Sequence, residues 1–83
     1  AGRRGLDECV YGAVRDMVSN AAGAAPARAF CPLVPARSTN RCYEGAGTII
    51  ATLETSDAAI RARCAELSTP YAGACRAGAG LRS

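Results

Sequence analysis

The chain reads Cys64-Ala-Glu-Leu-Ser-Thr-Pro-Tyr-Ala-Gly-Ala-Cys75-Arg-Ala-Gly78-Ala-Gly80, and an earlier stretch reads Cys31-Pro-Leu-Val-Pro-Ala-Arg-Ser-Thr-Asn-Arg-Cys42-Tyr-Glu-Gly45-Ala-Gly47. In both stretches ten residues separate two cysteines, and a Gly-Ala-Gly follows the second cysteine. A partial third copy, Cys9-Val-Tyr-Gly12-Ala13, lies upstream at the same offset. The copies follow one another at a period of about 33 residues, a length typical of stacked helical hairpins in which each unit packs on its neighbours.

The period divides the chain into units. Aligning residues 9–41 with residues 42–74 needs no gap and matches both cysteines, the glycine and the helix boundaries. We therefore expect an all-α fold of tandem antiparallel helical hairpins, a short solenoid with disulfides between consecutive hairpins. The units are about 9–41 and 42–74, with a partial unit at 75–83. The alternative is a small helical bundle in which the likeness between units is accidental.

Apolar residues recurring every three or four positions predict five helices, at residues 5–20, 24–33, 39–54, 57–67 and 70–80. Asn20 and Gly23 are expected to end the first helix, because Asn and Gly adopt a positive φ at low cost. Ser38 or Thr39 is expected to cap the third helix. Asp7 and Glu8 are expected in the first turn of the first helix, where acidic groups suit the helix dipole.

Three glycines recur at the repeat period, each three residues after a cysteine: Gly12, Gly45 and Gly78. A glycine inside a helix costs about 1 kcal/mol relative to alanine, so a compensating contact is expected. We interpret these as packing glycines that let the second helix of the preceding unit approach closely. Gly47 is expected to allow the close approach of a neighbouring helix as well.

Five cysteines in 83 residues favour disulfides formed in an oxidising compartment. Reduced structural cysteines and a metal site are the less favoured alternatives. The chain has no histidine and no Cys-x-x-Cys pair, which are the usual ingredients of zinc sites.

The pairing follows from the symmetry of an antiparallel hairpin, in which residues equidistant from the turn face each other. Cys64 and Cys75 are nearly equidistant from a turn near residue 69, and Cys31 and Cys42 from a turn near residues 36–37. Joining Cys42 to Cys64 would leave an offset of about 7 Å along the helices, which is beyond the reach of a disulfide. The sequence therefore predicts disulfides Cys31–Cys42 and Cys64–Cys75.

This pairing leaves Cys9 without a partner. By the repeat rule its partner would lie eleven residues upstream, before Ala1. The hypothesis is that the chain is a segment of a longer repeat protein and that Cys9 is paired outside it. A free Cys9 that takes part in redox exchange is a weaker alternative.

Composition argues against several functions. With no histidine or lysine, a serine or cysteine nucleophile lacks its usual base, so we expect no enzyme activity and no cofactor. The net charge of +3 is scattered over ten arginines and seven acids, which is not typical of nucleic-acid binding. The longest uncharged stretch, residues 17–27, is too short for a transmembrane helix.

The cysteine stretches and Cys42-Tyr43-Glu44-Gly45-Ala46-Gly47 resemble bacterial α/α-repeat proteins of the tetratricopeptide type, in a cysteine-bridged, secreted form. Such proteins present a concave surface to other proteins, and this is what the resemblance implies here.

The function expected is a non-catalytic periplasmic or secreted scaffold, an accessory subunit packing on other protein subunits. The larger assembly could be a membrane-bound respiratory or photosynthetic complex with which the chain associates peripherally. The alternative is a soluble module that binds peptides or cell-wall ligands. Tyr43 and Tyr71, taken as exposed, and Arg61 are the candidate partner contacts, with core or rim packing left open for the two tyrosines. Arg61 could form an arginine ladder with Arg28 that binds an acidic partner, but a solvated face is the favoured interpretation of these arginines.

Overall fold

The computed structural model describes residues 3–67 and 69–81. They form five α-helices and two 3-10 turns: α1 (Arg3–Ala21), α2 (Ala25–Phe30), η1 (Cys31–Leu33), α3 (Ala36–Leu53), α4 (Asp57–Ala65), η2 (Thr69–Tyr71) and α5 (Ala72–Gly78). No strand occurs among these residues, which confirms the all-α prediction. The molecule is elongated, with extents of 37 × 25 × 19 Å.

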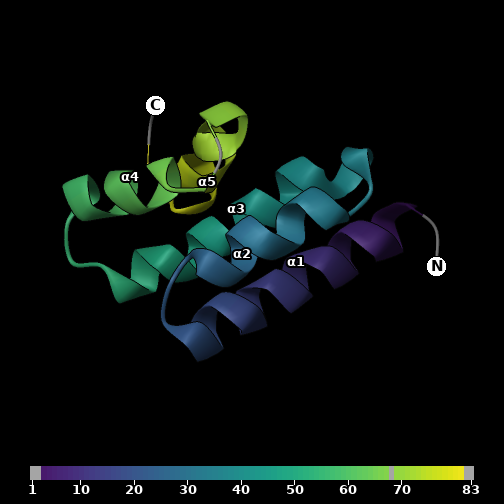
Figure 1. Cartoon of the computed structure of the whole chain (residues 1–83), viewed down its shortest axis with the longest axis horizontal. Helices are drawn as coiled ribbons and strands as arrows, with labels where there is room; N and C mark the ends of the chain where they lie inside the picture. The colour runs from purple at the N-terminus through teal and green to yellow at the C-terminus, as the bar shows by residue number, and fades with distance from the viewer. Residues whose placement is uncertain (1–2, 68, 82–83) are drawn as a thin grey trace.

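The long helix α3 lies at the centre, with α1 and α2 on one side and α4 and α5 on the other (Figure 1). The helices α1 and α3 run parallel, because contacts between them advance together along both helices. Ser38 meets Asp7 near their starts, and Arg15 meets Thr48 further along both. The short helix α2 runs back along α1 toward the start of α3, and α5 packs against the middle of α3.

The core is one cluster of mostly small apolar side chains, to which all five helices contribute. The apolar residues that recur at helical spacing in α1 are buried at Val10, Val14 and Val18, while Ala13 and Met17 are half-buried. Further along the chain, Ile49 is half-buried and Leu53 is 38% exposed. The buried apolar residues at helical spacing there are Cys42, Ala46, Ile50, Ile60, Cys64 and Leu67. Because the chain has no tryptophan and few other aromatics, the fold depends on backbone proximity and cross-links.

The end of α1 and the start of α3 are formed by residues other than those expected to cap them. Residue Ala22, rather than Asn20 or Gly23, takes the positive φ of 53° that ends α1, and the amide of Gly23 then donates to the carbonyl of Val18. The helix α3 begins at Ala36, with Pro35 as its N-cap residue, so Ser38 and Thr39 lie inside the helix and are buried. Their hydroxyls are used in other contacts: Ser38 donates to Asp7, and Thr39 donates to the carbonyl of Pro35.

Candidate functional site

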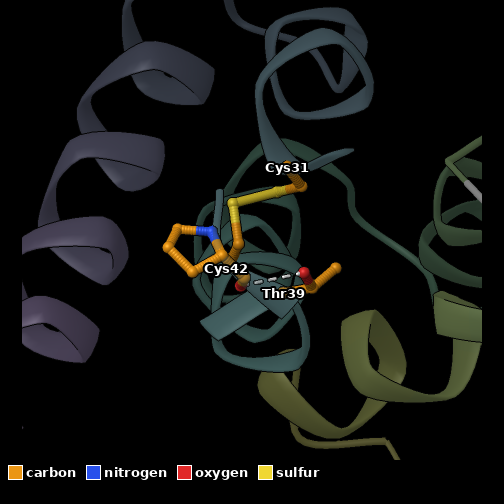
Figure 2. Close-up of a disulfide and its surroundings, with 4 residues drawn as sticks. Cys31, Thr39 and Cys42 are labelled. Atoms are coloured by element: carbon orange, nitrogen blue, oxygen red, sulfur yellow. Dashed lines mark hydrogen bonds between the residues drawn. A yellow bond between two sulfur atoms is a disulfide. The ribbon is translucent and has the colours of Figure 1, made fainter. Parts of the chain in front are cut away.

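Both predicted disulfides are present and lie wholly inside the molecule. Cys31–Cys42 joins η1 to α3, and Cys64–Cys75 joins α4 to α5, with Cα–Cα distances of 5.6 and 5.5 Å. All four cysteines are 0% exposed. Figure 2 shows Cys31–Cys42 at the start of α3, beside the hydrogen bond that Thr39 donates to the carbonyl of Pro35. Each bond thus locks the turn between two helices.

At Gly45, α3 lies close against α1. A β-carbon placed on Gly45 would lie 2.7 Å from Cγ1 of Val14 and 3.1 Å from the carbonyl oxygen of Tyr11. No real β-carbon tolerates the shorter of these distances, so any larger residue would have to push α1 away. The neighbour is the first helix of the preceding predicted unit, not the second helix that the sequence suggested, because α1 and α3 pack side by side.

Gly47 and Gly78 form a second close contact, between α3 and α5. A β-carbon on Gly47 would overlap the carbonyl of Cys75, and one on Gly78 would overlap the carbonyl of Glu44. In both cases the obstacle is backbone, which cannot swing aside as a side chain can. The close approach expected at Gly47 is therefore present. At Gly78 the approach is present too, but the neighbour is α3, the first helix of the preceding predicted unit, rather than its second helix.

The contacts of Gly45, in the predicted unit 42–74, and Gly78, in the partial unit 75–83, lie at equivalent positions of the repeat. Gly45 meets the carbonyl of Tyr11, and Gly78 meets the carbonyl of Glu44, so each glycine meets the residue 34 positions before it. The two contacts are separated by the repeat period of the sequence, as are the two disulfides.

Gly12 does not act as a packing glycine within the described part of the chain, which corrects the prediction. It is exposed, and a β-carbon there would meet nothing within 4 Å. The physical reason is its place on the outer side of α1, where none of the described helices lies. Cys9, one turn earlier on the same helix, is exposed and is not in a disulfide.

The expectation that Tyr43 is an exposed contact residue is wrong. Tyr43 is 2% exposed, and its ring stacks on that of Tyr71 with centroids 4.8 Å apart and planes 12° apart. Tyr71 is half-buried. The stacked rings join Tyr71, at the start of α5, to Tyr43 of α3. This contact lies inside the molecule, so the buried ring of Tyr43 is not part of a surface for a partner.

The arginines proposed as a ladder lie on the surface. Arg28 and Arg61 are both exposed, and Arg28 donates to the carbonyl oxygen of Glu66 at 3.3 Å. Their neighbour Arg63 bonds the carboxylates of Glu54 and Glu66 at 3.0 and 3.3 Å. The hydrogen bond to Glu54, followed by the charge of Glu66, raises the pKa of Arg63.

The acidic pair of α1 contacts α3 instead of serving the helix dipole. The helix begins at Arg3, which places Asp7 and Glu8 beyond its first turn. Asp7 accepts a 2.6 Å hydrogen bond from Ser38, whose side chain is fully buried. Glu8 forms an ion pair with Arg41 at 3.5 Å, and the Arg41 guanidinium also lies 3.9 Å from the ring centroid of Tyr11.

The surface feature that was not predicted from the sequence is Leu33. Its side chain is 81% exposed, although leucine is among the residue types most often buried in proteins. The residues on either side are constrained: Cys31 is held in its disulfide, and Pro32 and Pro35 restrict the backbone. We call residues 31–35 the Leu33 turn. The available signal in the sequence was the pair of prolines, which restrict the backbone here and disfavour a continued helix that would bury Leu33.

A shallow pocket of about 40 Å³ lies between the start of α2 and the end of α4, and is lined by Ala24, Ala25, Arg28, Glu66 and Leu67. Pockets that hold small organic ligands are typically several times larger, roughly 300–1,000 Å³. The described residues contain no group of three or more acidic, cysteine or histidine side chains placed to hold a metal ion. None of the helices described is both long and apolar enough to cross a bilayer.

Comparison of the chain with protein-family models, curated proteins and solved structures finds no match.

Proposed function

We propose that this chain is a non-catalytic, extracytoplasmic helical-repeat scaffold that packs against other protein subunits. The observation that carries the proposal is the recurrence of one contact. The glycine-to-carbonyl approach and its accompanying disulfide occur twice, one repeat period apart, in helices that follow one another. When the same contact joins each unit to the next, the units form an extended molecule. Extended helical repeats commonly provide binding surfaces for other proteins.

The proposed location is the periplasm or the cell exterior. Two buried disulfides support this location, because such bonds form and persist in oxidising compartments and are rare in reducing ones. Membership of a tetratricopeptide-like class is part of the same proposal, and the parallel packing of α1 and α3 supports it. In a stack of helical hairpins the first helices of successive units lie side by side in this way.

The Leu33 turn is the proposed contact with the partner. An apolar side chain that is held rigid before binding loses little conformational entropy when it is buried, so it contributes more to affinity than a flexible one. Leu33 meets this description because its turn is fixed by a disulfide and two prolines. Arg37, four residues later in the sequence, is exposed and positively charged. The partner surface that fits this turn has an apolar socket with an acidic rim, as an accessory subunit of a larger complex would find on its neighbour.

The alternative, a module binding peptides or cell-wall ligands, finds less support. It needs a groove with converging polar groups, and the pocket between α2 and α4 is small and is crossed by the hydrogen bond from Arg28 to Glu66.

Native co-purification tests the proposal. The tagged chain is produced in the cells that make it and isolated without denaturants, as wild type, as Leu33→Asp and as the control Ala29→Asp. Ala29 is also exposed but lies outside the Leu33 turn. A protein subunit retained at a fixed ratio by the wild type and the control, and lost by Leu33→Asp, supports the scaffold. A free monomer carrying a small ligand in all three preparations contradicts it.

A further inference from the structure

We propose that the pocket between α2 and α4 receives the last residue of a partner protein chain. The terminal carboxylate of that chain binds Arg28, and its small apolar side chain enters the pocket. This assignment rests on the scaffold proposed above and names the part of the partner subunit that the pocket holds. The pocket has no room for a whole ligand, but it has room for one small side chain.

The inner lining of the pocket is apolar and its mouth is polar. Ala24 and Leu67 are buried, whereas Arg28 and Glu66 are exposed. A single water molecule needs roughly 10–15 Å³ of such space, so a pocket of about 40 Å³ takes about three non-hydrogen atoms. The methyl group of alanine or the isopropyl group of valine fits this space, and an aromatic side chain does not.

Arg28 has hydrogen-bond donors to spare at the mouth of the pocket. Its Nη1 donates to the carbonyl oxygen of Glu66 at 3.3 Å, whereas Nε and Nη2 have no partner among residues 3–67 and 69–81. One carboxylate can accept from both of these nitrogens at once, which is the geometry that arginine favours with carboxylates. Arg28 therefore has a free edge that suits an anion with two oxygens.

Glu66 is the acidic residue among those that line the pocket, and its carboxylate is already paired. It accepts from Nη1 of Arg63 at 3.3 Å. This ion pair offsets the repulsion that the Glu66 charge would exert on an incoming carboxylate. The lining thus offers one arginine with unused donors beside a small apolar space.

A chain end carries the two groups that such a lining fits. In a C-terminal alanine or valine, the carboxylate and the small side chain are bonded to the same Cα. An arginine beside a small apolar pocket therefore meets both groups at once. The side chain of an aspartate or glutamate ends in its carboxylate, so it leaves no apolar group to occupy the pocket.

The pocket lies between the two predicted units. Ala24, Ala25 and Arg28 belong to unit 9–41, and Glu66 and Leu67 to unit 42–74. A residue bound there contacts both units and stabilises the folded chain by mass action. The affinity for an isolated peptide is low, because an exposed ion pair contributes little. On a subunit already held at the Leu33 turn, the effective concentration of the chain end raises the occupancy of the pocket.

The experiment is a nuclear magnetic resonance titration of the isotopically labelled chain, with both disulfides intact. The probe is acetyl-Ala-Ala-Ala with a free terminal carboxylate, and the same tripeptide with a terminal amide is the matched control. We expect the free acid to shift the backbone amide signals of Ala25, Arg28 and Leu67 to saturation. The amide should bind about fivefold more weakly, the upper end for an exposed ion pair. Acetyl-Ala-Ala-Phe should leave these signals unshifted.

Three variants test the two halves of the site, with circular dichroism and thermal melting to verify that each is folded. Arg28→Gln should bind the acid and the amide equally, because no charge then distinguishes them. Ala25→Leu adds bulk at the pocket and should abolish the shifts. Ala58→Leu is its control and should bind as the wild type does, since Ala58 is the equivalent exposed residue of the next predicted unit and lies outside the pocket.

Several outcomes overturn the assignment. The first is a wild type that shows no shifts or does not distinguish acid from amide, and the second is binding of acetyl-Ala-Ala-Phe. Binding of acetyl-Ala-Asp-Ala amide at the strength of the free acid also overturns it, because a side-chain carboxylate would then suffice. Sodium propionate that binds as well as the tripeptide would show that the pocket takes free small carboxylates rather than a chain end.

The pocket and the Leu33 turn are tested separately. Leu33→Asp leaves the pocket intact, so it should keep the response to the peptide. A partner subunit retained by a chain that gives no peptide response overturns the pocket assignment alone. A peptide response without any retained subunit counts against the scaffold alone.

Discussion

Gly78 lies so close to the backbone carbonyl of Glu44 that a β-carbon on the glycine would overlap the carbonyl oxygen. Gly78→Ala is therefore expected to destabilise the fold by about 1–3 kcal/mol, the usual cost of overpacking, despite the better helix propensity of alanine. Gly12→Ala has open space around it and should stabilise the fold by about 0.5–1 kcal/mol. Urea unfolding of both variants measures the difference. Equal effects of the same sign would contradict the contact geometry.

The Cys64–Cys75 disulfide fastens α5, which has only seven helical residues, to the rest of the chain. Replacing both cysteines with alanine is expected to lower the free energy of unfolding by about 3 kcal/mol, because the bond restricts a short loop in the unfolded chain. The measurement is thermal unfolding without reductant. Cys9→Ser is the control, and it should leave the melting temperature unchanged because Cys9 is exposed and outside both disulfides.

The stack of Tyr43 on Tyr71 gives a coupling that a double-mutant cycle can isolate. Tyr43→Ala should cost about 3–5 kcal/mol, because it empties a fully buried site. Combined with Tyr71→Ala it should show a coupling of about 0.5–1.5 kcal/mol, the range of aromatic pairs. Denaturant unfolding of the four proteins tests this. Simple additivity of the two substitutions would mean that the rings do not interact.

The hydrogen bond from Ser38 to Asp7 joins α3 to α1 across 31 residues of sequence. Ser38→Ala is expected to cost about 1–3 kcal/mol, since the hydroxyl is fully buried and its partner carboxylate loses a donor. Ser19→Ala, at an exposed position of α1, serves as the control and should change stability little. Chemical unfolding distinguishes the two, and a neutral Ser38→Ala would show that water replaces the hydroxyl.

Ala22 ends α1 with a φ of 53°, in the left-handed region that favours glycine. Ala22→Gly is expected to stabilise the fold by up to about 1 kcal/mol, because it relieves the steric cost of the alanine β-carbon. Ala22→Val should destabilise it, since branching at that carbon increases the cost. Melting temperatures of the two variants should therefore move in opposite directions.

The features that could be predicted from sequence are those that depend on near neighbours. The two disulfides follow from the symmetry of a single turn, and the inward faces of the helices follow from their apolar period. The features that could not be predicted depend on distant partners. Ser38 does not cap α3 and instead donates its hydroxyl to Asp7 of α1. Tyr43 is buried, and its ring stacks on Tyr71. Gly12 has the local sequence of a packing glycine, but its contact depends on whether another helix is present.

Gly45 contacts α1 and Gly47 contacts α5, so α3 is notched on two sides only two residues apart. Each residue advances an α-helix by about 100°, which places these notches about 200° apart around its circumference. One residue inserted at Ala46 would rotate one notch by about 100° more relative to the other. The angular separation of the two glycines therefore sets where α5 lies relative to α1 around α3.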